Sequence, residues 1–149
     1  MSDEIAERQR AAAFAFFSAA GRADAAGQLA VMDDSAAYWS VDGHFNRYTY
    51  TGKAAIERFL NTFYSQAKAV EYNIQRVASS DDIVMVEWAD AASVLDGSEY
   101  ENQGVMIFEF VPGSDRVRSL RSYFDWKPLL EHASWRASML EHAESDRDS

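Results

Sequence analysis

The first part of the chain carries apolar residues at the spacing of an α-helix. Apolar positions recur every three or four residues from Asp3 to Gly21, which predicts a helix that Asp3 caps and Gly21 ends. Asp24 is placed to cap a short second helix that ends near Met32. A third helix opens at Thr51-Gly52, and its apolar stripe consists of Ile56, Phe59, Leu60, Phe63 and Ala67.

After the third helix the apolar period changes to every second residue, which predicts β-strands. Turn residues separate the later runs, and one short strand precedes the third helix. The expected strands are Ala36 to Val41, a run around Val70 to Ile74, Ile83 to Leu95, Glu99 to Val111 and Arg116 to Trp126. Pro128 ends the last strand, and a closing helix is expected from Leu129 to Ala143.

This order of elements predicts an α+β fold. Helices gathered on one face of an antiparallel sheet are a stable way to bury the apolar side of both. We expect a curved antiparallel sheet wrapped around the N-terminal helices, in the shape of a cone (a cystatin-like roll) with an open-ended hydrophobic pocket. A single domain is expected over residues 1–143, followed by a polar C-terminal tail over residues 144–149.

The hairpin at Asp96-Gly97 decides which face of the strand from Glu99 lines the pocket. A two-residue loop pairs Asp90 with Gln103, whereas a three-residue loop that includes Ser98 pairs Asp90 with Gly104. We prefer the three-residue loop because it turns the more aromatic face inward. That face consists of Tyr100, Asn102, Gly104, Met106, Phe108 and Phe110.

Charge and composition exclude several classes of partner and site. The net charge is −10 and no cluster of Lys or Arg occurs, so neither nucleic acids nor membranes are expected partners. The apolar run from Ala11 to Ala20 is too short to span a bilayer and follows acidic residues, which indicates a buried helix. No cysteine is present, which fits a cytoplasmic location. The histidines lack the spacing of a metal site, so no metal or cofactor is expected; they are His44, His132 and His142.

Three stretches resemble the nuclear transport factor 2-like superfamily, in its SnoaL-like and ketosteroid-isomerase-like branch. They read GRADAAGQLAVMDDSAAYW, TGKAAIERF and LRSYFDWKPL, within roughly residues 5–130. The resemblance implies the cone-shaped fold described above, and homodimers through the convex sheet face are common in that superfamily. It implies no single activity, because the superfamily includes isomerases, cyclases, dehydratases, epoxide hydrolases and non-catalytic binding domains.

Neither of two chemistries known from that branch is complete in this chain. The limonene-epoxide-hydrolase pattern has Arg-x-Asp on a central strand, whereas this chain reads Trp88-Ala89-Asp90, so the Asp matches and the Arg does not. The second Asp of that pattern falls on Ser122, and its first-strand pair falls on Tyr38 and Ser40. The ketosteroid-isomerase pattern needs a Tyr on the first helix and an Asp base on the first strand, where this chain has Phe16 and Ser40.

Asp90 is the strongest candidate for chemistry. It is the single carboxylate on an otherwise apolar strand face, and an unpaired buried charge is costly. One interpretation is a desolvated general acid or base, assisted by Tyr38 as a hydrogen-bond donor to a substrate oxygen. The alternative is a carboxylate satisfied by a neighbouring hydroxyl or amide, beside an ordinary core tyrosine. The predicted substrate-binding residues are Ser40, Trp88, Asn102, Ser122, Met106, Phe16, Phe59 and Phe63.

Three functions agree with this sequence. We favour an enzyme that performs cofactor-free acid-base chemistry, of isomerase, lyase/cyclase or hydrolase type, on a small apolar oxygen-containing molecule. The alternatives are a module that binds a small hydrophobic ligand without changing it, and a dimerisation domain whose own side chains fill the pocket. A homodimer is expected through the convex sheet face, whose apolar residues are Met85, Ala89, Ala91, Val105, Ile107 and Tyr123.

Overall fold

A computed structural model of the chain describes residues 2–41, 47–125, 127–131 and 144–145. Helices α1 (Asp3–Gly21) and α2 (Ala25–Leu29) come first, followed by strands β1 (Met32–Val41) and β2 (Arg47–Thr51). Helix α3 (Lys53–Gln66) leads into β3 (Ala67–Ser80), β4 (Ile83–Val94), β5 (Glu99–Phe110) and β6 (Val117–Phe124). The described elements end with helix α4 (Lys127–Leu130) and strand β7 (Glu144–Ser145). This order is the α+β arrangement that the sequence predicts.

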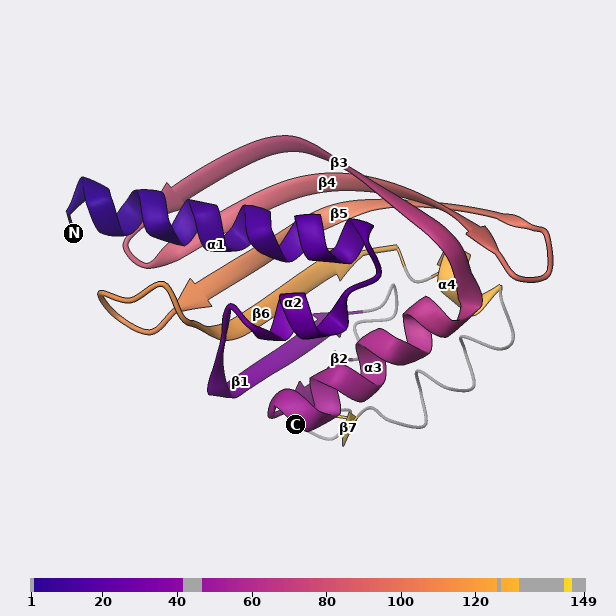
Figure 1. Ribbon diagram of the computed structural model, residues 1–149, viewed down its shortest axis with the longest axis horizontal. Helices are drawn as coiled ribbons and strands as arrows, with labels where there is room; N and C mark the ends of the chain where they lie inside the picture. The colour runs from indigo at the N-terminus through magenta and orange to yellow at the C-terminus, as the bar shows by residue number, and fades with distance from the viewer. Residues whose placement is uncertain (1, 42–46, 126, 132–143, 146–149) are drawn as a thin grey trace.

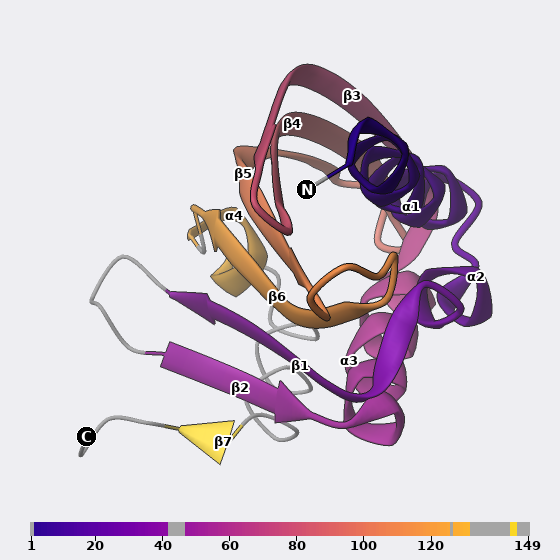
Figure 2. The same ribbon diagram turned by 90° about the vertical axis from the view of Figure 1, so that its left-hand side faces the viewer.

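The strands form one curved, open sheet in the order β3-β4-β5-β6-β1-β2-β7. Figures 1 and 2 show this sheet bending around the helices α1, α2 and α3. Neighbouring strands are antiparallel except β1 and β6, which run parallel. The sheet is therefore mixed and not wholly antiparallel, because no hairpin joins β1 to β6 and nothing local fixes their relative direction.

A β-bulge in β3 contributes to the curvature. Ile74 pairs with Trp88 and Arg76 pairs with Glu87, so β3 has one extra residue between these two pairs. Such an insertion bends the strand and increases its twist. The bend of β3 over α1 is visible in Figure 2.

The β4–β5 hairpin turns through Leu95, Asp96 and Gly97. The Gly97 N–H donates to the Val94 carbonyl at 2.9 Å, and the Val94 N–H donates to the Ser98 carbonyl at 2.9 Å. Gly97 has φ +90°, which glycine adopts freely. Asp96 fixes the turn, since its Oδ1 accepts from the Ser98 N–H at 2.8 Å. The loop has three residues as we preferred, but it begins one residue earlier.

This earlier turn changes the partners that the sequence predicted across the hairpin. Asp90 pairs with Asn102, so both predicted partners, Gln103 and Gly104, are wrong. The register differs from the preferred one by two residues, and a shift of two leaves every side chain on its own face. The inward face is therefore the predicted one, and Tyr100, Asn102, Met106, Phe108 and Phe110 are all buried on it.

The helix caps differ in one case from the expectation. Ser2, and not Asp3, caps α1, because the Ser2 Oγ accepts from the Ile5 N–H at 3.3 Å. Asp24 caps α2 as expected, and its Oδ1 accepts from the Gly27 N–H at 3.0 Å. Both caps satisfy backbone N–H groups that a helix start leaves free.

Two helices end earlier than their apolar stripes suggest. Helix α2 stops at Leu29, because Met32 already pairs with Val117 as the first residue of β1. Ala67, expected on the third helix, is the first residue of β3 and pairs with Val94. In both places sheet pairing overrides the helical period.

The helices cover the concave face of the sheet through aromatic contacts. Phe16 and Phe17 of α1 meet Phe108 of β5 edge-on, with ring centroids 5.3 Å and 5.9 Å away. Phe59 of α3 stacks on Tyr50 of β2 at 4.3 Å. Large buried rings of this kind supply much of the apolar area that holds such a layer together.

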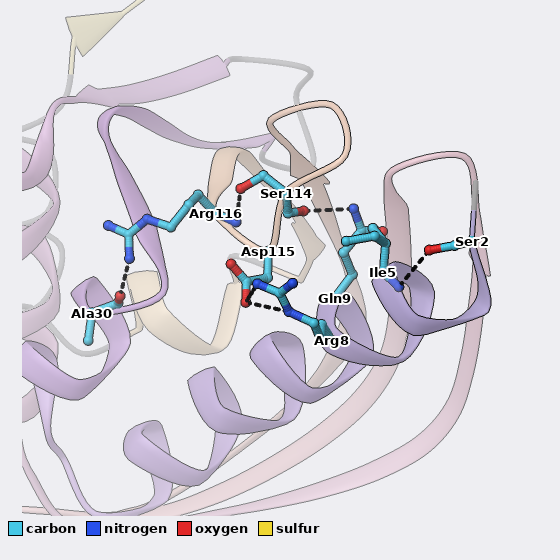
Figure 3. Close-up of polar contacts among 8 residues, drawn as sticks. All are labelled: Ser2, Ile5, Arg8, Gln9, Ala30, Ser114, Asp115 and Arg116. Carbon is cyan, nitrogen blue, oxygen red and sulfur yellow. Dashed lines mark hydrogen bonds and ion pairs between the residues drawn. The ribbon is translucent and has the colours of Figure 1, made fainter.

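Polar contacts tie the start of α1 to two loops of the sheet. Figure 3 shows those to the β5–β6 loop, at Ser114 and Asp115. Gln9 is 1% exposed, and its Nε2 donates to Asp82 Oδ1 and to the Ser114 carbonyl, both at 2.8 Å. Arg8 forms an exposed ion pair with Asp115 at 2.9 Å. The buried amide donates to both the β3–β4 turn and the β5–β6 loop, so it fixes the helix against the sheet.

Several predicted features lie outside the described residues. Only the first turn of the expected closing helix is described, as α4, and residues 132–143 are not. His44, His132 and His142 lie outside as well. Glu144–Ser145, assigned to the tail, pair with β2 as β7. No helix within the described residues is long and apolar enough to cross a membrane.

Candidate functional site

Asp90 lies on the concave face of β4 among apolar neighbours. Val86 and Trp88 precede it on the same face and are 1% and 4% exposed, and Asp90 is 7% exposed. Tyr72 of β3 and Asn102 of β5 are its cross-strand partners. The period-two pattern of β4 therefore buries this carboxyl inside the cone.

A second row of side chains on the same face joins β5, β6 and β1. Ser122 of β6 pairs with Met106 of β5 on one side and with Ser40 of β1 on the other. Both serines are fully buried, and Tyr38, two residues before Ser40, is 5% exposed. The parallel pairing of β1 with β6 thus carries first-strand residues to the wall opposite the helices.

A cavity of about 60 Å³ lies between this face and the helices. Eight of the ten predicted site residues line it, namely Phe16, Tyr38, Phe59, Phe63, Trp88, Asp90, Met106 and Ser122. The wall also includes Phe17, Gln28, Leu60, Tyr64, Tyr72, Tyr100 and Phe124. Since one water needs about 10–15 Å³ of such space, the cavity holds a few waters or a compact organic group.

The other two predicted residues, Ser40 and Asn102, do not border this cavity. Ser40 is buried in the sheet beside Ser122. The Asn102 Nδ2 donates to the Tyr100 hydroxyl at 2.8 Å and to the Asp125 carbonyl at 2.7 Å, and Asn102 borders a groove outside the cavity. A substrate-binding role for either residue stays a prediction.

Three polar residues of the wall were missed by the sequence analysis. Gln28 is 2% exposed, and its Oε1 accepts a hydrogen bond from the Tyr64 hydroxyl. Tyr64 follows Leu60 by one helical turn, a spacing that indicates its direction, and Tyr72 belongs to the alternating run of β3. No pattern pointed to Gln28, because a polar residue on a short helix is typical of a surface position.

Burial sets the charge state of the two predicted catalytic residues. It raises the pKa of Asp90 to about 7, and a hydrogen bond from the Asn102 backbone N–H partly offsets this rise. Burial also raises the pKa of Tyr38 to about 12, and the nearby Ser122 hydroxyl lowers it in part. Asp90 therefore exchanges its proton near neutral pH, whereas Tyr38 stays protonated and can donate a hydrogen bond.

Three residues of the cavity wall each contain a buried polar atom that has no hydrogen-bond partner in the described part of the chain. The atoms are Asp90 Oδ1, Trp88 Nε1 and Ser122 Oγ, and the last of these lies close to the Tyr38 hydroxyl without the geometry of a full hydrogen bond. Native folds rarely leave buried polar atoms without a partner, so these atoms mark where a ligand or a water would bind. Together they offer an acid or base, an indole donor and a hydroxyl.

The described residues provide no group of three His, Cys, Asp or Glu side chains arranged to bind a metal ion. From these residues the cavity wall receives a single carboxylate, that of Asp90. The chemistry that these side chains can perform is proton transfer and hydrogen bonding.

Comparison with known proteins places the fold. Residues 13–118 match the profile of the SnoaL-like domain family. The structure is similar to a putative isomerase from Bacillus subtilis, with 19% identity, 88% of this chain and 94% of that chain covered, and a TM-score of 0.73. It is also similar to BvnE pinacolase from Penicillium brevicompactum, with 14% identity, 93% and 97% covered and a TM-score of 0.72.

An LEH-like epoxide hydrolase from M. tuberculosis is a third similar structure, with 20% identity, 91% of this chain and 92% of that chain covered, and a TM-score of 0.64. Identities this low show a shared fold and carry no activity from one protein to another. No curated protein matches the chain by sequence.

Proposed function

We propose that this chain, which belongs to the SnoaL-like domain family, is an enzyme that performs cofactor-free acid-base chemistry on a small apolar molecule containing oxygen. One observation carries the proposal. Asp90 is a buried carboxyl whose pKa is about 7, and its Oδ1 has no partner among the described residues on the wall of an aromatic cavity. A general acid or base works best when its pKa lies near the working pH.

In this proposal Asp90 transfers the proton and the other wall residues position the substrate. The Tyr38 hydroxyl, which stays protonated, donates a hydrogen bond to the substrate oxygen, and Ser122 assists it. Trp88 and the phenylalanines pack on the hydrocarbon part of the substrate. The reaction is of isomerase, lyase/cyclase or hydrolase type and needs no covalent intermediate.

The similar structures support this range of reactions without choosing among them. Their names include a putative isomerase, a pinacolase and an LEH-like epoxide hydrolase. The fold therefore hosts several activities, and the side chains of this cavity must decide which one applies.

Finding the substrate is the first step of the test. Native mass spectrometry of the purified protein detects a co-purified small molecule, and a thermal-shift screen with apolar ketones, epoxides and lactones extends the search. Turnover of a hit is then compared between the wild type, Asp90→Asn and Glu101→Gln. Glu101 neighbours Asn102 on β5 but is exposed, so it serves as the matched control.

We expect Asp90→Asn to lower turnover by about 10²–10⁴-fold, the usual contribution of general acid-base catalysis. The Glu101→Gln variant is expected to keep the wild-type rate. Unchanged turnover in Asp90→Asn would remove Asp90 from the mechanism.

A binding module without catalysis is the second candidate, and one observation favours it. The limonene-epoxide-hydrolase pattern has a second Asp at the position of Ser122 and a polar partner at that of Ser40. Among the described residues, the cavity wall therefore has no carboxylate besides Asp90. A ligand that co-purifies and returns chemically unchanged after prolonged incubation would support this candidate.

We also propose that two copies associate through the convex face of the sheet, in a cytoplasmic setting. Met85 and Tyr123 on that face are 43% and 42% exposed. Trp39 contacts Tyr123 at a ring distance of 5.4 Å, and the Arg121 guanidinium lies over Trp39. A second copy would cover this apolar and aromatic surface.

A further inference from the structure

The charge of the cavity wall carries an inference about the ligand. Among the described residues, no Lys, Arg or His lines the cavity, and the one carboxyl is Asp90. We infer that this cavity binds small organic cations of the ammonium type in preference to neutral or anionic molecules of the same shape. The inference adds an ammonium group to the oxygen-containing substrate of the proposed function, and rests on that proposal only in taking the same cavity as the substrate site.

The Asp90 carboxyl has the Asn102 backbone N–H as a donor but no positive partner of the kind that a buried ionised group needs, among the described residues. It is 7% exposed, and its Oδ1 has no hydrogen-bond partner in the part of the chain that the structure describes. An ionised carboxylate in such a place is costly unless a positive charge or several donors compensate it. A cationic ligand provides that compensation, whereas a carboxylate or phosphate ligand adds to the repulsion.

The groups that face Asp90 do not supply the missing positive charge. Tyr72 on β3 and Asn102 on β5 are its cross-strand partners. Tyr38 and Tyr100 are close enough for the charge of Asp90 to raise the pKa of their hydroxyls. Burial raises the pKa of all three tyrosines, so these phenols are neutral at physiological pH. Within the described residues, only a proton or a ligand can balance the charge of Asp90.

The aromatic wall suits a cation as well. Tyr72 meets Trp88 at 67° with ring centroids 6.1 Å apart, and Phe124 meets Trp88 at 51° and 6.2 Å. Neither ring is stacked on the indole, and all three line the cavity. Aromatic faces attract ammonium groups, most strongly when the face belongs to a tryptophan and water is excluded.

An acidic groove outside the cavity also borders Asp90. This groove has a volume of about 560 Å³, and Asp90 is part of its wall together with Glu71, Glu101 and Asp125. The chain as a whole carries a net charge of −10. Both features raise the local concentration of cations near Asp90 and lower that of anions.

Three small molecules of nearly the same shape test the inference directly. Choline is positive, 3,3-dimethylbutan-1-ol is neutral and 3,3-dimethylbutanoate is negative. Their dissociation constants are measured by isothermal titration calorimetry on the full chain, in about 150 mM salt to screen surface charge. At about pH 8.5, where Asp90 is ionised, we expect choline to bind about tenfold or more tightly than the alcohol, and the anion to bind weakest.

Two controls assign the preference to Asp90. In the wild type the preference for choline should shrink at about pH 5.5, because Asp90 is then protonated. Asp90→Asn should lose the preference at both pH values, while Glu87→Gln, which removes an exposed charge of β4 outside the cavity and the groove, should keep it. If Asp90→Asn fails to fold, the pH dependence of the wild type still decides the question.

Equal affinity for choline and the neutral alcohol at high pH would overturn the inference, as would a preference that Asp90→Asn retains. These outcomes are separate from the failure of the proposed function, since binding is measured without turnover. If the protein shows no preference for choline but its turnover depends on Asp90, the proposed acid-base function stands and the inference about cations is wrong. If the protein prefers choline through Asp90 but its turnover does not depend on Asp90, the inference about cations stands and the catalytic role of Asp90 is wrong.

Discussion

Asp90 of β4 and Asn102 of β5 are direct cross-strand partners, and the Asn102 backbone N–H donates a hydrogen bond to the Asp90 carboxyl. The same asparagine uses its side chain elsewhere, on the Tyr100 hydroxyl and the Asp125 carbonyl. One backbone donor is too little to hold the buried carboxyl in its charged form, so the pKa of Asp90 stays near neutrality.

The stability of the fold should therefore depend on pH through Asp90. Its pKa is about 7 in the folded chain and 3.8 as a free group, so between these values the folded chain binds more protons than the unfolded chain. Asp90 costs nothing below about pH 4. Its destabilisation of the fold grows as the pH rises from about 4 to about 7, and levels off above that at on the order of 4 kcal/mol.

Asp90→Asn removes this titration and keeps an oxygen that can accept from the Asn102 N–H. We expect the variant to be more stable than the wild type by roughly 2–4 kcal/mol at about pH 8.5, with a much smaller difference at about pH 5. Urea unfolding of both proteins at the two pH values measures this. The difference between the proteins isolates Asp90 from the histidines, and a difference that does not change with pH would contradict the assigned pKa.

Gly104 is required by the close approach of β5 and β6. A Cβ at this position would lie 2.2 Å from the Tyr123 backbone oxygen and 2.9 Å from the Phe124 Cβ. Because the first of these atoms belongs to the backbone, the strands themselves must move. We expect Gly104→Ala to lower the free energy of unfolding by roughly 3 kcal/mol, measured by urea unfolding.

Gly21 provides the matched control for that substitution. It is the last residue of α1, its φ lies outside the positive range that favours glycine, and a Cβ there would meet nothing within 4 Å. Gly21→Ala should leave the stability within about 1 kcal/mol of the wild type. Equal effects of the two alanines would show that the β5–β6 contact is looser than described.

Gln9 and Arg8 are neighbours on α1 that differ in burial, and their alanine variants should differ accordingly. Gln9→Ala removes two donors from a buried site and leaves Asp82 and the Ser114 carbonyl short of a partner, which should cost about 1–3 kcal/mol. Arg8→Ala removes an ion pair whose side chains are 52% and 37% exposed, and should cost less than about 1 kcal/mol. Thermal unfolding of the two variants compares them, and the opposite ranking would argue against the contact in Figure 3.

The convex face is tested by the mass of the protein in solution. Light scattering at micromolar concentration should give twice the 16.8 kDa mass of one chain. Tyr123→Glu places a charge at the centre of the proposed interface and should shift the mass toward the monomer. Phe14→Glu is the control, because Phe14 on α1 is 44% exposed and lies away from the sheet face, so this variant should stay dimeric. A monomer mass for the wild type would end the dimer proposal.

The hairpin of β4 and β5 shows how far a sequence pattern reaches. Period-two alternation placed Asp90, Tyr100 and Met106 on the inner face, and all three are buried there. The pattern did not fix which residues stand opposite each other, because this depended on Asp96 accepting from the Ser98 N–H and starting the turn one residue early. Face is a property of one strand, whereas register belongs to the loop and to two strands together.

The cavity wall likewise includes residues that the pattern of one segment predicts and residues that only a contact between segments explains. Phe59 and Phe63 follow the helical stripe of α3 and were predicted, but Gln28 has no such signal. It is buried because α2 lies against α3, where the Tyr64 hydroxyl donates to its amide oxygen. Such a contact between two helices cannot be predicted from the sequence pattern of either helix alone.

The sequence by itself determined most of the elements, the faces that they bury and the isolation of one carboxyl, Asp90, on an apolar strand. These features follow from the periods of the α-helix and the β-strand, which are local and can be recognised in the spacing of apolar residues. The tertiary structure alone decided that β1 runs parallel to β6, which sets Tyr38 and Ser122 on the wall of one cavity. It also decided that, among the described residues, Asp90 has a single backbone donor and an oxygen without a partner, because partners across a sheet are set by turns and packing far from the residue itself.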